Sequence, residues 1–207
     1  DFQIKQAVEK IKNSKKPIII SGGGVFYSDA MDELGNFAIK HNIPVTQTVM
    51  GYSTMKKDHS HFVGPIGGLG GKAANNLAKE TDLAICIGTK LADFTTGSWA
   101  NFENPEFKLV SINIARHDAN KHLAEAVIGD AKVTLTELSN AIGDWKSSDS
   151  WHKKSQVELK SWNEYVDKES GPTNQELPSY AHAVGAIYRN SDPTDIAVTA
   201  AGGLVGE

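Results

Sequence analysis

The sequence predicts an α/β fold, namely a doubly wound, Rossmann-like parallel sheet with helices on both faces, followed by a truncated second α/β segment. Two observations support this prediction. Short apolar runs of strand type alternate with stretches of helical periodicity, and glycine-rich turns separate several of them. Each apolar run is continuous, which is typical of parallel strands that are buried on both faces.

The expected elements follow one another at regular intervals. In the first half of the chain they are an amphipathic helix over 2–13, a strand over 18–20, a glycine turn over 22–24, a helix that Ser28 caps, a strand over 43–49 and a helix over 73–79. Further strands are expected over 83–87 and 108–114, and a brief strand precedes a helix that starts at about residue 133.

Composition changes after residue 145 and predicts the domain organisation. Residues 1–145 form the main α/β domain in this interpretation, and the polar stretch "GDWKSSDSWHKK" leads into a linker and helix over 146–172. The run "DIAVTAAGG" predicts a strand and a glycine turn, so 173–207 are expected to be the truncated start of a second α/β domain.

Composition also narrows the classes of function. A net charge of −4 gives no electrostatic basis for binding nucleic acid or an anionic membrane, and no apolar run is long enough to span a bilayer. The single cysteine, Cys86, cannot form an internal disulfide and is typical of a reducing, cytoplasmic compartment.

Candidate binding residues lie where predicted strands end, because ligands of open parallel sheets bind at the carboxyl ends of the strands. Gly22, Gly23 and Gly24 follow the first strand, and glycines allow the backbone to approach a phosphate closely. A tight strand-to-helix turn needs glycine equally, so both readings stay open. The next candidate group follows the strand over 83–87 and consists of Gly88, Thr89 and Lys90.

Other motifs lack the features that their chemistry requires. The stretch "GGLGGKAAN" contains G-x-G-x-x-A from Gly68 to Ala73, but no clear strand precedes it, so a flexible or packing loop is expected. The spacing of the histidines does not match a zinc pair, and Cys86 reads as a core residue. The residues alone give no metal site and no catalytic constellation.

Several stretches together resemble the central domain of thiamine-diphosphate enzymes, a family that includes acetolactate synthase and pyruvate oxidase. They are "KPIIISGGG", "AIKHNIPVTQTVMGYST", "GPIGGLGGKAANN", "TDLAICIGTKLADF", "LVSINIARHDANK" and "VIGDAKVTLTEL". The tail "SYAHAVGAIYRNSDPTDIAVTAAGG" resembles the start of the family's diphosphate-binding domain. Within the family, "DFTTGSW", "SINIARHDANK" and "TAAGGLVGE" are most similar to the inositol-catabolism branch, which hydrolyses a cyclic trihydroxy-dione.

The resemblance implies a cofactor and an activity for the parent protein. Thiamine diphosphate, held by Mg²⁺, would supply the chemistry for C–C cleavage, with a glutamate in an N-terminal domain and a metal motif beyond Glu207. Ala201, Gly202 and Gly203 are the residues expected near thiamine diphosphate in this chain. The 207-residue fragment is thus expected to be inactive, and the full-length protein to be a homo-oligomer.

Members of this family hold FAD, ADP or no ligand in the central domain. The glycine turn and Gly88–Lys90 match the nucleotide-binding members, but Asn113 stands where relatives carry an aspartate that binds ribose hydroxyls. Asn113 lacks that charge, which argues against FAD and leaves ADP open. The alternative function is therefore an FAD- or ADP-binding central domain of an acetolactate-synthase-like or other 2-oxo-acid enzyme. A sirtuin-type deacylase would need four zinc-ligating cysteines, and the chain has one.

Overall fold

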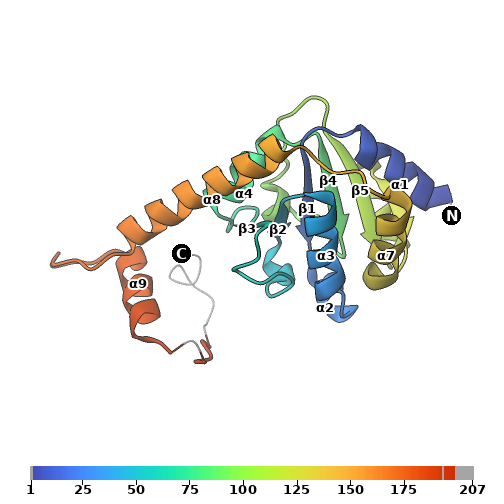
Figure 1. Cartoon of the computed structure of the whole chain (residues 1–207). Helices are drawn as coiled ribbons and strands as arrows, with labels where there is room; N and C mark the ends of the chain where they lie inside the picture. Colours follow the sequence, from blue (N-terminus) through green and yellow to red (C-terminus); the bar gives the residue numbers. More distant parts are fainter. Residues whose placement is uncertain (1, 193, 199–207) are drawn as a thin grey trace. The chain divides into compact units, whose positions relative to one another are not determined.

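Six parallel strands form one sheet in the order β3-β2-β1-β4-β5-β6 (Figure 1). The computed structural model describes residues 2–192 and 194–198, and the chain divides into two compact units, Asp1–Leu159 and Lys160–Glu207. The strands, all in the first unit, are β1 (Pro17–Ser21), β2 (Val45–Gln47), β3 (Phe62–Pro65), β4 (Leu83–Ile87), β5 (Lys108–Asn113) and β6 (Glu125–Ile128). This strand order is that of dinucleotide-binding folds, and the predicted fold class is confirmed.

β1 and β4 lie at the centre of the sheet, where the strand order reverses. Ile19 of β1 pairs with Val45 of β2 on one side and with Ile85 of β4 on the other. All five residues of each central strand are buried, which explains why these strands read as continuous apolar runs. The core therefore lies on both faces of β1 and β4.

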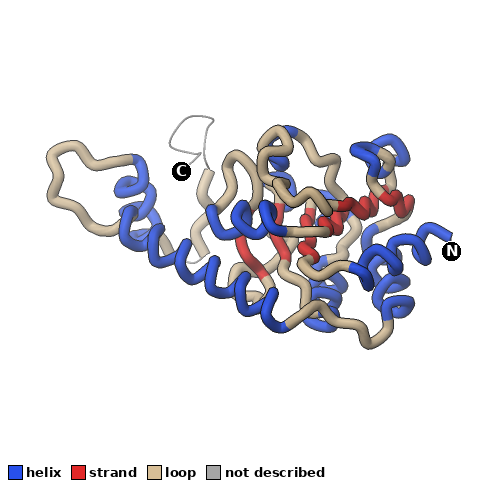
Figure 2. Tube along the Cα trace, turned by 90° about the horizontal axis from the view of Figure 1, so that it is seen from above, coloured by secondary structure: helices blue, strands red, loops and turns tan. Residues whose placement is uncertain are grey.

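Helices cover both faces of the sheet (Figure 2). On one face lie α1 (Phe2–Asn13), α2 (Gly23–Tyr27), α3 (Met31–His41) and α7 (Ala131–Ile142). From β1 to β3 the strands are added toward one edge of the sheet, and from β4 to β6 they are added toward the other edge. Because the crossovers are right-handed, the helices of the second series lie on the other face. They are α4 (Lys72–Glu80), α5 (Asp93–Thr96) and α6 (Arg116–Ala119). Short 3₁₀ turns, η1 (Val49–Gly51) and η2 (Lys121–Leu123), complete the connections.

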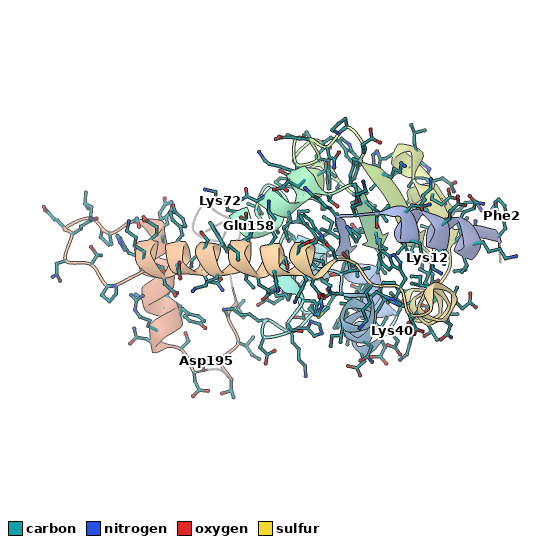
Figure 3. The ribbon with its side chains drawn as sticks, turned by 45° about the horizontal axis from the view of Figure 1, so that its top comes forward. Phe2, Lys12, Lys40, Lys72, Glu158 and Asp195 are labelled. Carbon is teal, nitrogen blue, oxygen red and sulfur yellow. The ribbon has the colours of Figure 1, made fainter. Side chains whose placement is uncertain are left out.

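α3 and α7 pack side by side on the first face. Lys40, labelled in Figure 3, reaches from α3 to donate to the backbone oxygen of Ser139 on α7 at 3.0 Å. Leu34 and Phe37 of α3 and Leu138 of α7 belong to the same core cluster. The buried side of the helix that was expected after the glycine turn therefore belongs to the core.

Three local predictions differ from the structure. The expected cap of α3, Ser28, instead ends α2, and Ala30 precedes α3 with no side-chain cap, because a separate short helix intervenes after the glycine turn. A strand, β3, precedes the glycine-rich loop, although the sequence showed no clear one. α7 starts two residues earlier than expected, because Asp130 caps it through the N–H groups of Lys132 and Val133.

α8 (Asp149–Glu169) is one long helix, and its first turns belong to the first unit. Trp151 is buried there, and its indole N–H donates to the backbone oxygen of Pro17, the first residue of β1, at 2.8 Å. Glu158, labelled in Figure 3, accepts a hydrogen bond from Asn76 of α4 at 2.8 Å. The start of α8 thus lies along the amino ends of the strands.

The second unit contains the rest of α8 and α9 (Tyr180–Asn190). α9 begins with a capping box in which the Ser179 hydroxyl and the His182 ring bond to each other's backbone N–H groups. Residues 195–198 are not in a strand, and the rest of the strand expected there lies outside the described residues. The domain boundaries at 145/146 and 172/173 stay a prediction.

Candidate functional site

A cleft of about 890 Å³ opens at the carboxyl edge of the sheet, where β1 and β4 end side by side. Its walls include six of the predicted site residues: Gly23, Gly24, Gly88, Thr89, Lys90 and Asn113. The carboxyl ends of β1, β4 and β5 meet at this edge, which brings together residues more than eighty positions apart. Volume and position match what is typical of a small-molecule site in a doubly wound fold.

The glycine turn packs directly against the backbone after β4. The Gly22 N–H donates to the Ile87 oxygen at 2.8 Å, and the Gly24 N–H donates to the Gly88 oxygen at 3.0 Å. A Cβ on Gly22 would lie 2.5 Å from the Gly88 oxygen, so no side chain fits. This packing accounts for Gly22 and Gly24 without any ligand, and contact of the turn with a ligand stays a prediction.

Asn113 joins the two loops that form the cleft wall after β4 and β5. Its amide nitrogen donates to the Thr89 backbone oxygen at 3.2 Å, and its amide oxygen accepts from the Ala115 N–H at 2.9 Å. Both ends of the amide are therefore used to hold the wall in place. Asn113, which was considered from the sequence as a ribose-binding residue, thus positions Thr89.

Two carboxylates that were not predicted from the sequence, Asp118 and Asp130, line the cleft. Asp118 pairs with Lys121 at 2.6 Å, and that hydrogen bond, with nearby Lys90 adding to it, holds the pKa of Asp118 below its ordinary value. The pKa of Asp130 is also lowered, first by a hydrogen bond from Ser28 and then by the N–H groups at the start of α7. Both are ionised at neutral pH. Asp130 could have been found as a helix cap before an apolar stretch.

Apolar side chains form the rest of the cleft. Tyr27, Met50, Phe94 and Ile114 line it, and each is more than 70% exposed. Large apolar side chains that gather in one place at a concave surface mark a binding site more often than scattered ones do. The cleft therefore offers an apolar surface with a cation, Lys90, and two carboxylates, Asp118 and Asp130, in its wall.

The glycine-rich loop before α4 is a packed loop. Asn75 of α4 bonds to both backbone groups of Gly67, accepting from its N–H at 2.9 Å and donating to its oxygen at 3.0 Å. Gly67 has φ +108°, and a Cβ there would lie 2.0 Å from the Phe94 oxygen. Of this loop only Leu69 reaches the cleft wall. Gly67 and Gly70 serve packing, since a Cβ on either would lie within 2.5 Å of another backbone atom.

Some predicted residues lie elsewhere. Ala201, Gly202 and Gly203 lie outside the described residues. Over residues 2–192 and 194–198, no group of three or more His, Cys, Asp or Glu side chains is placed to hold a metal ion. Cys86 is fully buried in β4, and burial raises the pKa of its thiol. No helix in the described part of the chain is long and apolar enough to cross a membrane.

Comparison with known proteins agrees with the resemblance found in the sequence. Over 99% of its length the chain is 35% identical to a 3D-(3,5/4)-trihydroxycyclohexane-1,2-dione hydrolase of Clostridium perfringens and 37% identical to one of Bacillus anthracis. These alignments cover 36% and 35% of the two relatives. A Bacillus cereus protein, 3D-(3,5/4)-trihydroxycyclohexane-1,2-dione hydrolase 2, is 47% identical over 67% of this chain, and the alignment covers 22% of that relative. The chain thus spans about a third of the length of the relatives that match it throughout.

The family model described as "Thiamine pyrophosphate enzyme, central domain" matches residues 4–138. These residues contain the whole sheet, the glycine turn and every described residue of the candidate site. The chain belongs to the central-domain family of thiamine pyrophosphate (thiamine diphosphate) enzymes.

Proposed function

We propose that this chain is the central part of a thiamine-diphosphate-dependent hydrolase that cleaves a C–C bond of a cyclic trihydroxy-1,2-dione in inositol catabolism. The observation that carries the proposal is 35–37% identity over 99% of the chain to proteins named for this hydrolysis. The reaction adds one water: the bond between the two carbonyl carbons breaks, one carbon becomes a carboxylic acid and the other an aldehyde. The protein is cytoplasmic and homo-oligomeric in this proposal.

Thiamine diphosphate, with Mg²⁺, would supply the electron sink for bond cleavage. The described residues offer no metal-ligand cluster of their own, and Ala201, Gly202 and Gly203 are the residues of this chain proposed to approach the diphosphate of the cofactor. We therefore assign no reaction step to a described side chain. The proposed role of residues 1–145 is to supply a rigid α/β domain, and the 207-residue chain alone should be inactive.

A panel of substrates tests the proposal. The full-length protein is supplied with thiamine diphosphate and Mg²⁺ and offered either the trihydroxycyclohexane-dione or pyruvate, with the 207-residue chain as a matched control. Loss of the dione with the full-length protein and none with the chain alone is the expected result. Conversion of pyruvate without conversion of the dione would instead favour the alternative, an acetolactate-synthase-like or other 2-oxo-acid enzyme.

A second candidate function is nucleotide binding in the central cleft, with ADP favoured over FAD. Its support is the cleft of about 890 Å³ at the switch point of the sheet, with Lys90 at its edge and apolar walls that suit an adenine ring. The geometry fits such a ligand only in part, because Asn113 is engaged by Thr89 and Ala115, and Asp118 by Lys121. Gly23, Gly24, Thr89 and Lys90 are the proposed contacts.

Calorimetric titration with ADP, and with FAD in parallel, tests whether the cleft binds a nucleotide. Saturable ADP binding that Lys90→Ala weakens would support a nucleotide site. Lys12→Ala is the matched control, since Lys12 lies on α1 (Figure 3) and does not line the cleft. Heat of binding that is absent for both ligands, or that Lys12→Ala lowers as much as Lys90→Ala does, would leave the cleft as an architectural feature.

A further inference from the structure

Three histidines from distant parts of the chain meet beside the start of α8. His59 and His61 precede β3, and His152 belongs to the first turn of α8. The rings of His61 and His152 stack, with centroids 4.2 Å apart and planes 21° apart, and the His59 ring lies 5.9 Å from that of His61. His61 is only 6% exposed. None of these residues contributes to the cleft at the opposite edge of the sheet.

Hydrogen bonds fix which ring nitrogen of neutral His61 carries the proton. The Asn42 amide nitrogen donates to the Ser147 oxygen at 3.2 Å and to Asp149 at 3.1 Å, so the amide oxygen of Asn42 faces His61. That oxygen, 3.2 Å away, can only accept, and Nε2 of His61 must therefore carry the proton. Nδ1 then accepts from the Ser60 hydroxyl at 3.0 Å.

The surroundings disfavour a charge on either ring of the pair. Nδ1 of His152 is buried with no hydrogen-bond partner among the described residues. The charged and titratable groups that act on these rings are Asp58 of the loop before β3, which faces His59, and Asp149 of α8, which faces His152. His61 itself faces the other two histidines. Asp149 is already engaged by Asn42. A proton on one ring would meet its stacked neighbour at 4.2 Å, and burial together with that neighbour lowers the pKa of His61 to about 4.

The stacked pair lies in the joint between the loop at residues 56–61 and α8. One helical turn beyond His152, the Gln156 side chain donates to the Ser60 oxygen at 2.9 Å. One residue before it, Trp151 bonds to the start of β1. Other contacts also hold the first turns of α8: the buried Trp151, the Lys154–Glu80 ion pair, and the hydrogen bonds that Asn42 and Asn76 donate to Asp149 and Glu158. Carboxylates ordinarily titrate well below neutral pH, so the ring stack is the part of this joint that titrates at mildly acidic pH.

We propose that the His61–His152 stack is an acid-sensitive latch, which holds the first turns of α8 against residues 56–61 while both rings are neutral and releases them when a ring takes up a proton. The open state has ordinary histidines that bind protons near pH 6.5, whereas the closed state resists protonation. Acidification therefore favours opening. This inference is independent of the proposed catalytic activity.

Hydrogen exchange of the full-length protein tests the latch. Protection factors, corrected for intrinsic exchange, are compared at about pH 7.5 and about pH 5 for residues 149–159, with the core strand 83–87 as internal reference. The expected result is a fall on the order of tenfold in the protection of 149–159 relative to the reference. An unchanged ratio in the wild-type protein would overturn the proposal, whether or not any variant folds.

A double variant, His61→Gln with His152→Phe, sharpens the test. Glutamine can still donate to Asn42 and phenylalanine keeps a ring in the stack, but neither can take up a proton. The expected result is protection of 149–159 that no longer falls with acidification, while His117→Gln, at an exposed histidine of α6 outside the joint, behaves as the wild type does. An acid-induced fall of wild-type size in the double variant would contradict the latch.

Discussion

Gly24 and Gly88 touch through their backbones at the point where the strand order of the sheet reverses. The Gly24 N–H donates to the Gly88 oxygen at 3.0 Å. A Cβ on Gly24 would lie 2.6 Å from the Gly88 Cα, and one on Gly88 would lie 2.5 Å from the Gly24 Cα. The loop after β1 and the loop after β4 meet here with no room for a side chain. This backbone contact fixes the part of the cleft wall that Gly24 and Gly88 form.

Gly88→Ala should destabilise the fold by about 2–4 kcal/mol, because φ is +60° at this position and the new methyl group would overlap Gly24. Urea denaturation measures the effect. Gly68→Ala is the matched control, since the nearest atom to a Cβ there lies 3.8 Å away. A Gly88→Ala variant within about 0.5 kcal/mol of wild type would contradict the close backbone contact.

Asn75→Ala should loosen the glycine-rich loop beside the cleft. The substitution removes both hydrogen bonds to Gly67 and should lower the free energy of unfolding by about 1–3 kcal/mol. Hydrogen exchange of residues 66–71 should quicken at the same time. Asn140→Ala, at an exposed position of α7, should change neither quantity, and equal effects of the two substitutions would argue against the role assigned to Asn75.

The stability of the fold should fall on acidification because of His61. In the unfolded chain His61 binds a proton near pH 6.5, whereas in the folded protein burial and the two neighbouring histidines lower the pKa of His61 to about 4. The unfolded state therefore binds more protons between these values, so the stabilisation is complete above pH 6.5 and is lost as the pH falls toward 4. One pKa unit corresponds to about 1.4 kcal/mol, which predicts a loss of about 2 kcal/mol from about pH 7.5 to about pH 5.

Urea denaturation at the two pH values checks this, with His61→Gln beside the wild type. The variant should show a smaller pH dependence, since glutamine does not titrate. His117→Gln, at an exposed histidine of α6, should keep the wild-type dependence. Equal pH dependence in all three proteins would mean that His61 is not the group responsible.

The sheet could be predicted from the sequence because its central strands are fully buried. "PIIIS" and "LAICI" carry no exposed face, and short continuous apolar runs that glycine turns follow are typical of buried parallel strands. β3 was missed because Phe62–Pro65 is four residues long and contains Gly64 and Pro65, which weaken a strand signal. Its partner β2 has only three residues, and the pairing between the two strands depends on tertiary contacts.

Part of the candidate site could be predicted, because the topology of a parallel sheet fixes where its strands end. The sheet's topology implies that strand ends meet, so Gly23, Gly24, Gly88 and Lys90 could be grouped from the sequence. Asp118 could not, because its place in the wall depends on how a four-residue helix follows β5. The histidine stack was also out of reach, since His61 and His152 are ninety-one positions apart and only the docking of α8 brings them together.

The identity of the product tests the central claim most directly. The full-length protein is incubated with the trihydroxycyclohexane-dione, with and without thiamine diphosphate and Mg²⁺, and the product is identified by mass spectrometry and NMR. We expect a cofactor-dependent open-chain product with the mass of the dione plus one water, carrying one carboxylic acid and one aldehyde. Release of CO₂, or an intact ring after incubation with the cofactor, would contradict it.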